Sequence, residues 1–372
     1  MPPVSEMPPL VRFGVVGVGQ RGGTYARALA EGEVPGATLT ALCDVRPETL
    51  APFSNAARFD DVRALLRDAR LDAVVVATPH PAHEEPTRLA LAAGLHVLAE
   101  KPLAVRAADV LRILEAYERR PRRAQVFATA LVLRADPRFV KLRNMLSEGA
   151  LGRVERISWT VTDCLRSDAY YASADWRGTF AGEGGGVLVN QCLHQLDLWQ
   201  WLFGMPDRVR AFFGFGRFHA IEVEDQVTAY LEYASGTTGV FVASTGEAPG
   251  TNRLEVAAER GRVVIEGASV EVWRNAVPTP ERIRTDGVRS PAPRVEYERS
   301  VLPVGGVGVP GLLTNFVRAV SGVEALIAPA HEGLRSIELS TALYASGLGG
   351  KTVELSVERA PHPRIARAVG PS

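Results

Sequence analysis

Between an apolar run at residues 11–17 and an amphipathic stretch at residues 22–31 lies the glycine-rich sequence Gly17-Val18-Gly19-Gln20-Arg21-Gly22. The first glycine permits a tight turn, the second lets the backbone approach a pyrophosphate, and the third lets a helix and a strand pack closely. The N-terminus of the following helix offers backbone N–H groups and a positive dipole end to phosphates. The motif, with all six of its residues, therefore predicts a dinucleotide-binding loop.

The first third of the chain continues this alternation. Short, nearly continuous apolar runs occupy residues 37–43, 71–78, 96–99 and 125–129, and helical stretches at residues 83–93 and 107–119 separate them. Buried strands alternating with helices indicate parallel βαβ units. We expect an α/β domain with a doubly wound parallel sheet, the Rossmann arrangement, over residues 8–128.

The pattern changes in the second part of the chain. Strands with alternating apolar and polar residues are expected at 153–162, 209–216, 225–233, 239–245 and 253–258, with a strongly apolar helix at 186–203 and further helices at 137–147, 311–320 and 332–346. This pattern predicts an α+β domain with an open, mainly antiparallel sheet over residues 129–357. We expect a flexible tail over residues 358–372.

Composition narrows the class of protein. A chain of 372 residues is expected to form two domains. Its 42 basic and 42 acidic residues give no electrostatic reason to bind nucleic acid or a membrane surface. The three cysteines lack the spacing of a zinc site or a disulfide framework, and neither a signal peptide nor a membrane span is indicated. We expect a cytoplasmic protein without a metal.

Asp44 lies at the end of the second predicted strand. Its distance from the glycine motif is close to the ~20 residues expected for a carboxylate that binds the ribose of a dinucleotide. Such a carboxylate accepts hydrogen bonds from both ribose hydroxyls and repels a 2′-phosphate, which favours NAD over NADP. Arg46 would instead favour NADP, because its guanidinium could pair with the 2′-phosphate. Asp44 could also simply cap the helix that begins at Pro47.

Lys101 is one of only three lysines in the chain, the others being Lys141 and Lys351, whereas arginines number 39. Lys101 lies in Glu100-Lys101-Pro102, directly after the strand at 96–99, and ligands of open α/β sheets bind beyond the carboxyl ends of the strands. Unlike arginine, a partly buried lysine can give up its proton and so can relay one. The alternative is an ordinary solvated lysine in a loop.

Asn190 and His194 are four residues apart in the predicted helix, so they share one of its faces. An imidazole titrates near neutral pH and can take a proton from a hydroxyl group. Asp197 lies three residues further and could orient the ring. The alternative is a histidine that only satisfies hydrogen bonds in the core.

A polar and aromatic loop precedes this helix and contains Tyr170, Trp176 and Arg177. Aromatic faces stack on sugar rings and arginine donates to hydroxyl or acidic groups, so these residues are candidates for substrate binding. Trp176 could equally pack beneath the loop. Further along the chain, Glu224 is interpreted as the start of a strand.

Together these motifs resemble the glucose-fructose oxidoreductase/inositol dehydrogenase/rhizopine-catabolism (Gfo/Idh/MocA) family along nearly the whole chain. The resemblance rests on the glycine motif, Ala77-Thr78-Pro79 with His83, Glu100-Lys101-Pro102, and the glycine-led helix with His194. It implies a Rossmann domain joined to an open-sheet domain, and NAD or NADP as cofactor.

The resemblance also implies roles for single residues. Lys101 and His194 would be the catalytic pair, and Thr78, Pro79, His83 and Glu100 would lie at the cofactor. One position departs from the family, which often has aspartate where this chain has Asn190; an amide orients a hydroxyl but carries no negative charge.

The leading functional hypothesis is an NAD-dependent dehydrogenase of a secondary alcohol in a sugar, sugar derivative or cyclitol. A second hypothesis uses the same groups for transient oxidation, elimination and re-reduction, which cleaves a glycoside without net change in the cofactor. A third is a non-catalytic NAD(P)-binding sensor. The resemblance further suggests a homodimer or homotetramer built through the open sheet.

Overall fold

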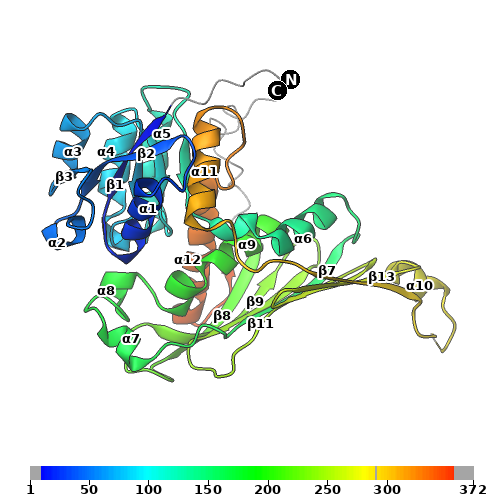
Figure 1. Cartoon of the computed structure of the whole chain (residues 1–372). Helices are drawn as coiled ribbons and strands as arrows, with labels where there is room; N and C mark the ends of the chain where they lie inside the picture. The colour runs from blue at the N-terminus through cyan, green and yellow to red at the C-terminus, as the bar shows by residue number, and fades with distance from the viewer. Residues whose placement is uncertain (1–9, 290, 356–372) are drawn as a thin grey trace, which may run out of the picture. The chain divides into compact units, whose positions relative to one another are not determined.

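The computed structural model describes residues 10–289 and 291–355. These residues form two compact units, each with its own sheet (Figure 1). The first contains the residues up to Arg134 together with Gly306–Ile337, and the second contains Ala135–Gly305 and the residues from Glu338 onward. The tail expected at 358–372 lies outside the described residues.

The first unit contains a sheet of six strands in the order β3-β2-β1-β4-β5-β6. All its pairings are parallel. The strands are β1 (Val11–Val16), β2 (Ala37–Cys43), β3 (Ala57–Phe59), β4 (Ala73–Val76), β5 (His96–Ala99) and β6 (Phe127–Thr129). The predicted doubly wound parallel sheet is confirmed, and the short strand β3 is an addition to it.

Helices cover both faces of this sheet. They are α1 (Gln20–Ala30), α2 (Pro47–Leu50), α3 (Val62–Asp68), α4 (Glu84–Ala92), α5 (Ala107–Glu118) and α11 (Gly308–Val320). Successive residues of β1 point to opposite faces: Phe13 joins the core under α1 and α11, whereas a side chain at Gly14 would meet Leu65 of α3 and Leu71.

Helix α11 belongs to the first unit although the sequence analysis placed it in the second domain. Its Phe316 ring lies 6.0 Å from the Phe13 ring of β1, centroid to centroid, and both side chains are buried. Figure 1 shows α11 alongside α1. The first unit is therefore discontinuous in sequence, a feature that a single boundary near residue 128 omits; the predicted limits of the domains otherwise remain predictions.

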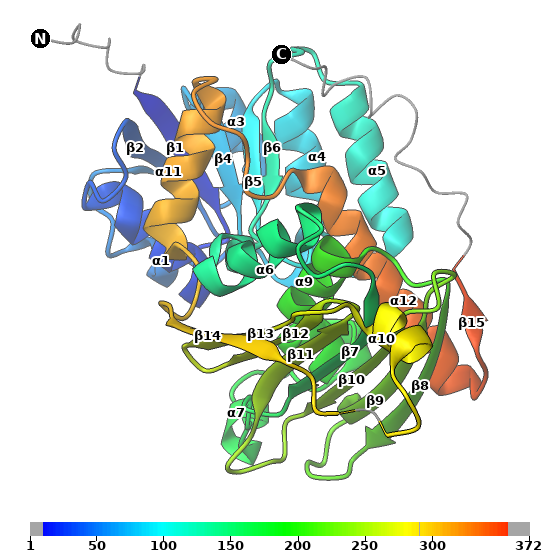
Figure 2. The ribbon, with the colours of Figure 1, turned by 90° about the vertical axis from the view of Figure 1, so that its right-hand side faces the viewer.

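The second unit contains a nine-stranded sheet in the order β14-β13-β12-β11-β7-β10-β9-β8-β15 (Figure 2). Only β7 and β10 pair in parallel. The strands are β7 (Val154–Val161), β8 (Arg208–Phe215), β9 (Glu224–Glu232), β10 (Thr238–Ser244), β11 (Asn252–Ala258), β12 (Gly261–Glu266), β13 (Ser269–Asn275), β14 (Val295–Val301) and β15 (Val353–Glu354). The predicted open, mainly antiparallel sheet is confirmed.

Helices pack against one face of this sheet. The helices of the second unit are α6 (Pro137–Ser147), α7 (Asp168–Ala172), α8 (Phe180–Glu183), α9 (Leu193–Phe203) and α10 (Thr279–Thr285). Helix α12 (Gly333–Gly349) begins in the first unit and continues into the second after Ile337. The Trp199 ring of α9 lies 6.4 Å from Trp159 of β7 and 6.0 Å from Phe241 of β10. All three aromatic side chains are buried and anchor α9 on the sheet.

The predicted helix at 186–203 is interrupted. A π-helical turn, Val187–Gln191, precedes α9, and Cys192 between them has a non-helical backbone conformation. Single 3₁₀ turns occupy His80–Ala82, Val132–Ala135 and Ala330–Glu332. No helix in the described part of the chain has both the length and the apolar character needed to cross a membrane.

Candidate active site

The glycine loop of the first unit leaves no room for side chains at two positions. Gly17 has a φ of 82°, and a Cβ there would lie 2.6 Å from the Thr78 backbone nitrogen. A Cβ on Gly22 would lie 1.7 Å from the Gly17 carbonyl oxygen. The loop therefore packs backbone against backbone, as the motif predicts for the first and third glycines.

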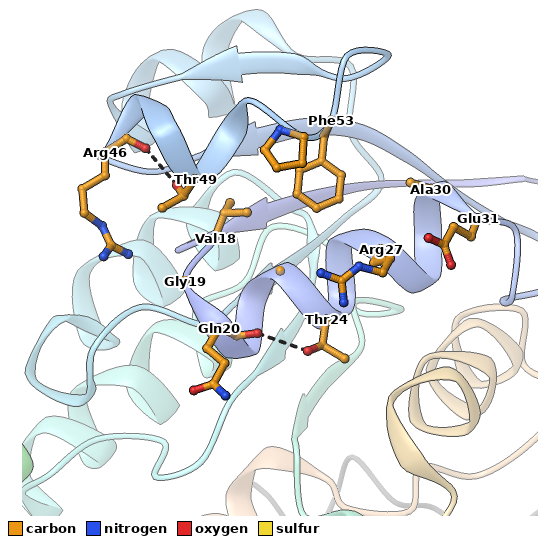
Figure 3. A pocket seen from close by; sticks show the side chains of 12 residues that line it. Val18, Gly19, Gln20, Thr24, Arg27, Ala30, Glu31, Arg46, Thr49 and Phe53 are labelled. Carbon is orange, nitrogen blue, oxygen red and sulfur yellow. Dashed lines mark hydrogen bonds between the residues drawn. The ribbon is translucent and has the colours of Figure 1, made fainter. Parts of the chain in front are cut away.

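A cavity of about 870 Å³ opens beside this loop (Figure 3). It is lined by Val18, Gly19, Gln20, Gly23, Thr24, Arg27, Ala30, Glu31, Arg46, Thr49, Pro52 and Phe53. A Cβ on Gly19 would approach only the end of the Arg46 side chain, at 3.3 Å, so the backbone at the start of α1 is open. These residues fit a dinucleotide cofactor, whose pyrophosphate would lie on the loop and the helix N-terminus.

Asp44 holds the glycine loop to the end of β2. Its Oδ2 accepts the Val18 N–H at 2.7 Å, and its Oδ1 accepts the Arg46 N–H at 2.9 Å and faces Arg46 Nε at 3.3 Å. Burial opposes ionisation, but the hydrogen bonds from Arg46 and Val18 outweigh it and hold the pKa of Asp44 below its ordinary value. Asp44 does not cap α2, because the residue at the cap position is Arg46.

Glu100 lies beneath the glycine loop at the end of β5. Its Oε1 accepts hydrogen bonds from Arg21 Nε at 2.5 Å and from the Tyr25 hydroxyl at 2.6 Å, and its Oε2 accepts the Lys101 N–H at 3.1 Å. Burial opposes ionisation of Glu100, but the charge of Arg21 and the hydrogen bond from Tyr25 outweigh it and lower its pKa. Arg21 of the motif is thus turned towards Glu100, and Lys101 is half-buried beside it.

His83 joins the turns that follow β4 and β5. Its Nδ1 lies 2.7 Å from the Pro102 carbonyl oxygen and its Nε2 lies 2.7 Å from the Thr78 carbonyl oxygen. The side chain is only 1% exposed, so these two backbone groups enclose it. The resemblance places Thr78, Pro79 and His83 at the cofactor; the geometry shows His83 acting on the turns around it.

In the second unit a buried carboxylate holds the start of the π-helical turn. Glu224 Oε2 accepts the Gly186 N–H at 3.0 Å, Oε1 accepts the Leu188 N–H at 3.0 Å, and the Tyr344 hydroxyl donates to Oε2. A Cβ on Gly186 would lie 2.0 Å from the Glu224 carbonyl oxygen, and one on Gly185 would lie 2.2 Å from the Tyr344 hydroxyl. The glycine run is therefore required by close packing.

Asn190 and His194 lie on consecutive helical segments. Asn190 belongs to the π-helical turn and His194 to the first turn of α9, so the prediction that one α-helix presents both is wrong. The extra residue per turn changes their angular relation. Asp197 accepts a hydrogen bond from Gln200 Nε2 at 3.0 Å, and its proposed role in orienting His194 stays a prediction.

The loop residues converge on the Tyr170 hydroxyl. It accepts hydrogen bonds from Arg177 Nη1 at 2.5 Å, Gln191 Nε2 at 3.2 Å and Asn190 Nδ2 at 3.3 Å. Arg177 also lies over the Trp176 ring, 4.5 Å from its centroid, and Trp176 is 38% exposed. Three of these residues were predicted to bind substrate together with Asn190.

Three members of this cluster were not predicted. Gln191 Oε1 accepts a hydrogen bond from Arg166 Nη2, and Glu183 accepts hydrogen bonds from Asn190 Nδ2 and the Gly178 N–H. Their sequence neighbourhood gave one signal only, the glycine run that follows Glu183. The catalytic pairing of Lys101 with His194 stays a prediction, because Lys101 belongs to the first unit and His194 to the second.

Comparison with known proteins matches both units to one family. Residues 11–128 match the oxidoreductase family with an NAD-binding Rossmann fold, and residues 139–264 match the Gfo/Idh/MocA C-terminal domain.

Individual relatives agree. The chain is 33% identical over 214 residues to an inositol 2-dehydrogenase of Acidothermus cellulolyticus, covering 55% of this chain and 57% of the relative, so it spans little more than half of that protein. It is 27% identical to a myo-inositol 2-dehydrogenase of Thermotoga maritima over 68% of this chain and 74% of that one.

A solved structure extends the likeness. The WlbA dehydrogenase of Bordetella pertussis, in complex with NADH and UDP-GlcNAcA, superposes with a TM-score of 0.77 at 26% identity over 94% of this chain and 99% of that chain. The chain belongs to the Gfo/Idh/MocA oxidoreductase family, and its first unit contains that family's NAD-binding Rossmann fold.

Proposed function

We propose that this chain is an NAD-dependent oxidoreductase that transfers a hydride between a secondary alcohol of a sugar, sugar derivative or cyclitol and the nicotinamide. The observation that carries the proposal is the hydrogen bond from Arg21 to Glu100. This bond connects the glycine loop to the turn after β5, which contains Lys101. A titratable lysine is thus held at the carboxyl end of β5, where ligands of such sheets bind. The relatives named above are dehydrogenases of inositol and of sugar-derived compounds.

Two side chains would handle the hydroxyl proton. When bound, NAD supplies the carbon that accepts or returns the hydride. His194 takes the proton from the substrate hydroxyl as general base, and Lys101 donates a hydrogen bond to the same oxygen and assists proton transfer. Asn190 orients the hydroxyl through its amide, and Tyr170, Trp176 and Arg177 bind the rest of the substrate.

Asp44 would select NAD over NADP. Its carboxylate is ionised at neutral pH, because hydrogen bonds lower its pKa, and it lies beside the loop that would bind the pyrophosphate. An ionised carboxylate accepts ribose hydroxyls and repels a 2′-phosphate. Arg46 Nε lies 3.3 Å from Asp44 Oδ1, and the Arg46 side chain lines the same cavity.

The open face of the second sheet would assemble the chain into a homodimer or homotetramer in the cytoplasm. Phe212 of β8 and Tyr230 of β9 are 58% and 41% exposed, and Arg210 lies over the Phe212 ring at 4.9 Å. Aromatic and arginine side chains are enriched in protein interfaces. Light scattering on the protein and on a Phe212→Lys variant tests this; a wild-type monomer contradicts it.

The activity is tested with a Lys101→Met variant and with Lys351→Met as the control, because Lys351 is exposed. Both proteins are assayed for NADH formation against inositols, polyols and pyranoses, and for NAD binding by calorimetry. We expect Lys101→Met to bind NAD with unchanged affinity and to lose at least about 100-fold in kcat, a typical effect of general acid–base groups. An active Lys101→Met variant removes the assignment.

The same assay separates the two enzymatic hypotheses. A dehydrogenase forms one NADH for each product molecule, whereas glycoside cleavage through transient oxidation accumulates none. Binding of NAD without turnover of any compound supports the sensor.

A further inference from the structure

More hydrogen-bond donors than acceptors surround the Tyr170 hydroxyl. Arg177 Nη1, Gln191 Nε2 and Asn190 Nδ2 all donate to this one oxygen, at 2.5, 3.2 and 3.3 Å. A phenolic oxygen offers two lone pairs, so three donors exceed its capacity. The cluster therefore has donor groups to spare for a ligand that is rich in acceptors.

Arg166 adds further donors to the same cluster. Its Nη2 donates to Gln191 Oε1 and its Nη1 donates to the Leu165 carbonyl oxygen at 3.0 Å. Its Nε is buried and has no hydrogen-bond partner within the described residues. Arg166 and Arg177 both lie over the Tyr170 ring, at 5.0 and 4.2 Å from its centroid, so two positive charges share one aromatic side chain.

Within residues 10–289 and 291–355, no carboxylate neutralises either guanidinium. In the described parts of the chain, no ion pair involves Arg166 or Arg177, whereas other arginines of the same unit form them, such as Arg156 with Glu255 at 2.5 Å. The carboxylate of Glu183 is directed to the Gly178 N–H and to Asn190 Nδ2. Two guanidinium groups without a carboxylate partner favour a ligand that brings a negative charge.

We propose that the substrate carries an anionic group, a carboxylate or a phosphate ester, which binds Arg166 and Arg177 beside Tyr170. The inference rests on the proposed function and names the class of its substrate: an acidic sugar or cyclitol derivative. Guanidinium groups bind both anions through paired N–H···O hydrogen bonds. Gln191 accepts a hydrogen bond from Arg166, and Trp176 is 38% exposed, so its ring can stack on the sugar.

The test compares matched substrates that differ only in charge. Glucose, galactose and mannose, their uronates and their 6-phosphates are assayed with NAD, and kcat/KM is determined for each. We expect at least one acidic member to exceed its neutral parent about tenfold or more, since the anionic group adds charge-assisted hydrogen bonds to the two guanidinium groups. Preference for uronates or for phosphates identifies which anion binds.

Variants then assign the effect to the cluster. Arg166→Gln and Arg177→Gln should each reduce the acidic-to-neutral ratio of kcat/KM about tenfold. Arg208→Gln is the control, because Arg208 is exposed on β8 and pairs with Glu232 at 3.1 Å; it should leave the ratio unchanged.

The outcomes are distinct. Equal kcat/KM for neutral and acidic members overturns the inference and leaves the proposed function standing. A preference for acids that survives both substitutions overturns it as well. Turnover of none of these compounds, nor of inositols, contradicts the proposed function itself.

Discussion

Arg21 of the glycine loop and Glu100, the residue before Lys101, form an ion pair with Arg21 Nε 2.5 Å from Glu100 Oε1. Tyr25, one helical turn after Arg21, donates to the same oxygen at 2.6 Å. Helix α1 thus holds the turn after β5 through two side chains. A substitution that breaks the contact between Arg21 and Glu100 should therefore alter the positions of both the glycine loop and Lys101.

A Glu100→Gln variant should be less stable and should bind NAD more weakly. We expect a loss of about 2 kcal/mol in the free energy of unfolding at pH 7, because a charged hydrogen-bonding partner is removed from a buried site. Urea denaturation measures the first effect and calorimetry the second. Glu115→Gln, which removes an exposed ion pair with Arg119, should cost less than about 0.5 kcal/mol.

The effect of Glu100→Gln should also depend on pH. The pKa of Glu100 in the folded protein lies below its ordinary value of 4.5, so its contribution to stability is complete above that pH. It is lost as the pH falls through the lowered pKa. The difference between wild type and variant should therefore shrink below about pH 4.5; a constant difference contradicts the ion-pair account.

An Asp44→Ser variant should shift cofactor preference towards NADP. The substitution removes the charge that repels a 2′-phosphate and releases Arg46 to pair with it. We expect the ratio of kcat/KM for NADP to that for NAD to rise at least about tenfold. Asp60→Ser, an exposed change in the same unit, is the control. If the ratio is unchanged in Asp44→Ser, the Asp44 carboxylate does not bind the ribose of the cofactor.

A His83→Ala variant should lower kcat more than it changes KM for NAD. The Thr78 and Pro102 carbonyl oxygens lose their shared partner, so the turns after β4 and β5 lose a fixed spacing. Burial lowers the pKa of His83, so the neutral ring donates to one of these oxygens, and leaving that buried acceptor unpaired costs about 1–3 kcal/mol of stability. His83→Gln retains one donor and should restore part of kcat. Equal activity of all three proteins contradicts a positioning role.

A Tyr344→Phe variant should destabilise the start of the π-helical turn. It removes the hydroxyl that donates to Glu224 and accepts the Gly186 N–H at 2.9 Å. We expect a loss of about 1–2 kcal/mol in the free energy of unfolding and a fall in kcat, because Asn190 and His194 follow this turn. Tyr297→Phe, at an exposed tyrosine of β14, should change neither.

Local chemistry explains what the sequence predicted well. The glycine loop depends on backbone space within a few residues, and strands such as β1, β4, β5 and β6 are apolar because both their faces are buried. Asp44 follows from a fixed distance along the chain. Side chains that meet only after folding left no such pattern: Arg177 and Gln191 lie in different segments yet both donate to the Tyr170 hydroxyl, and Arg166 donates to Gln191.

The misread elements have equally physical causes. Residues 186–203 are apolar with helical periodicity, and that periodicity does not distinguish a π-helical turn followed by α9 from one α-helix. Glu224 was interpreted as a strand start, which it is, but its carboxylate also holds the backbone of Gly186. Helix α11 carries an apolar face whose partner, the Phe13 side of β1, lies at the other end of the sequence.

The return of α11 to the first unit imposes an order on biosynthesis. While residues 135–305 are being translated, α11 has not yet been synthesised. Phe13 and its neighbours on β1 and α1 therefore lack the apolar helix face that covers them in the folded protein. A nascent or truncated chain ending at Arg134 therefore exposes core surface, and such surfaces promote aggregation. The nucleotide-binding half of this protein reaches its native state only after most of the other half has left the ribosome.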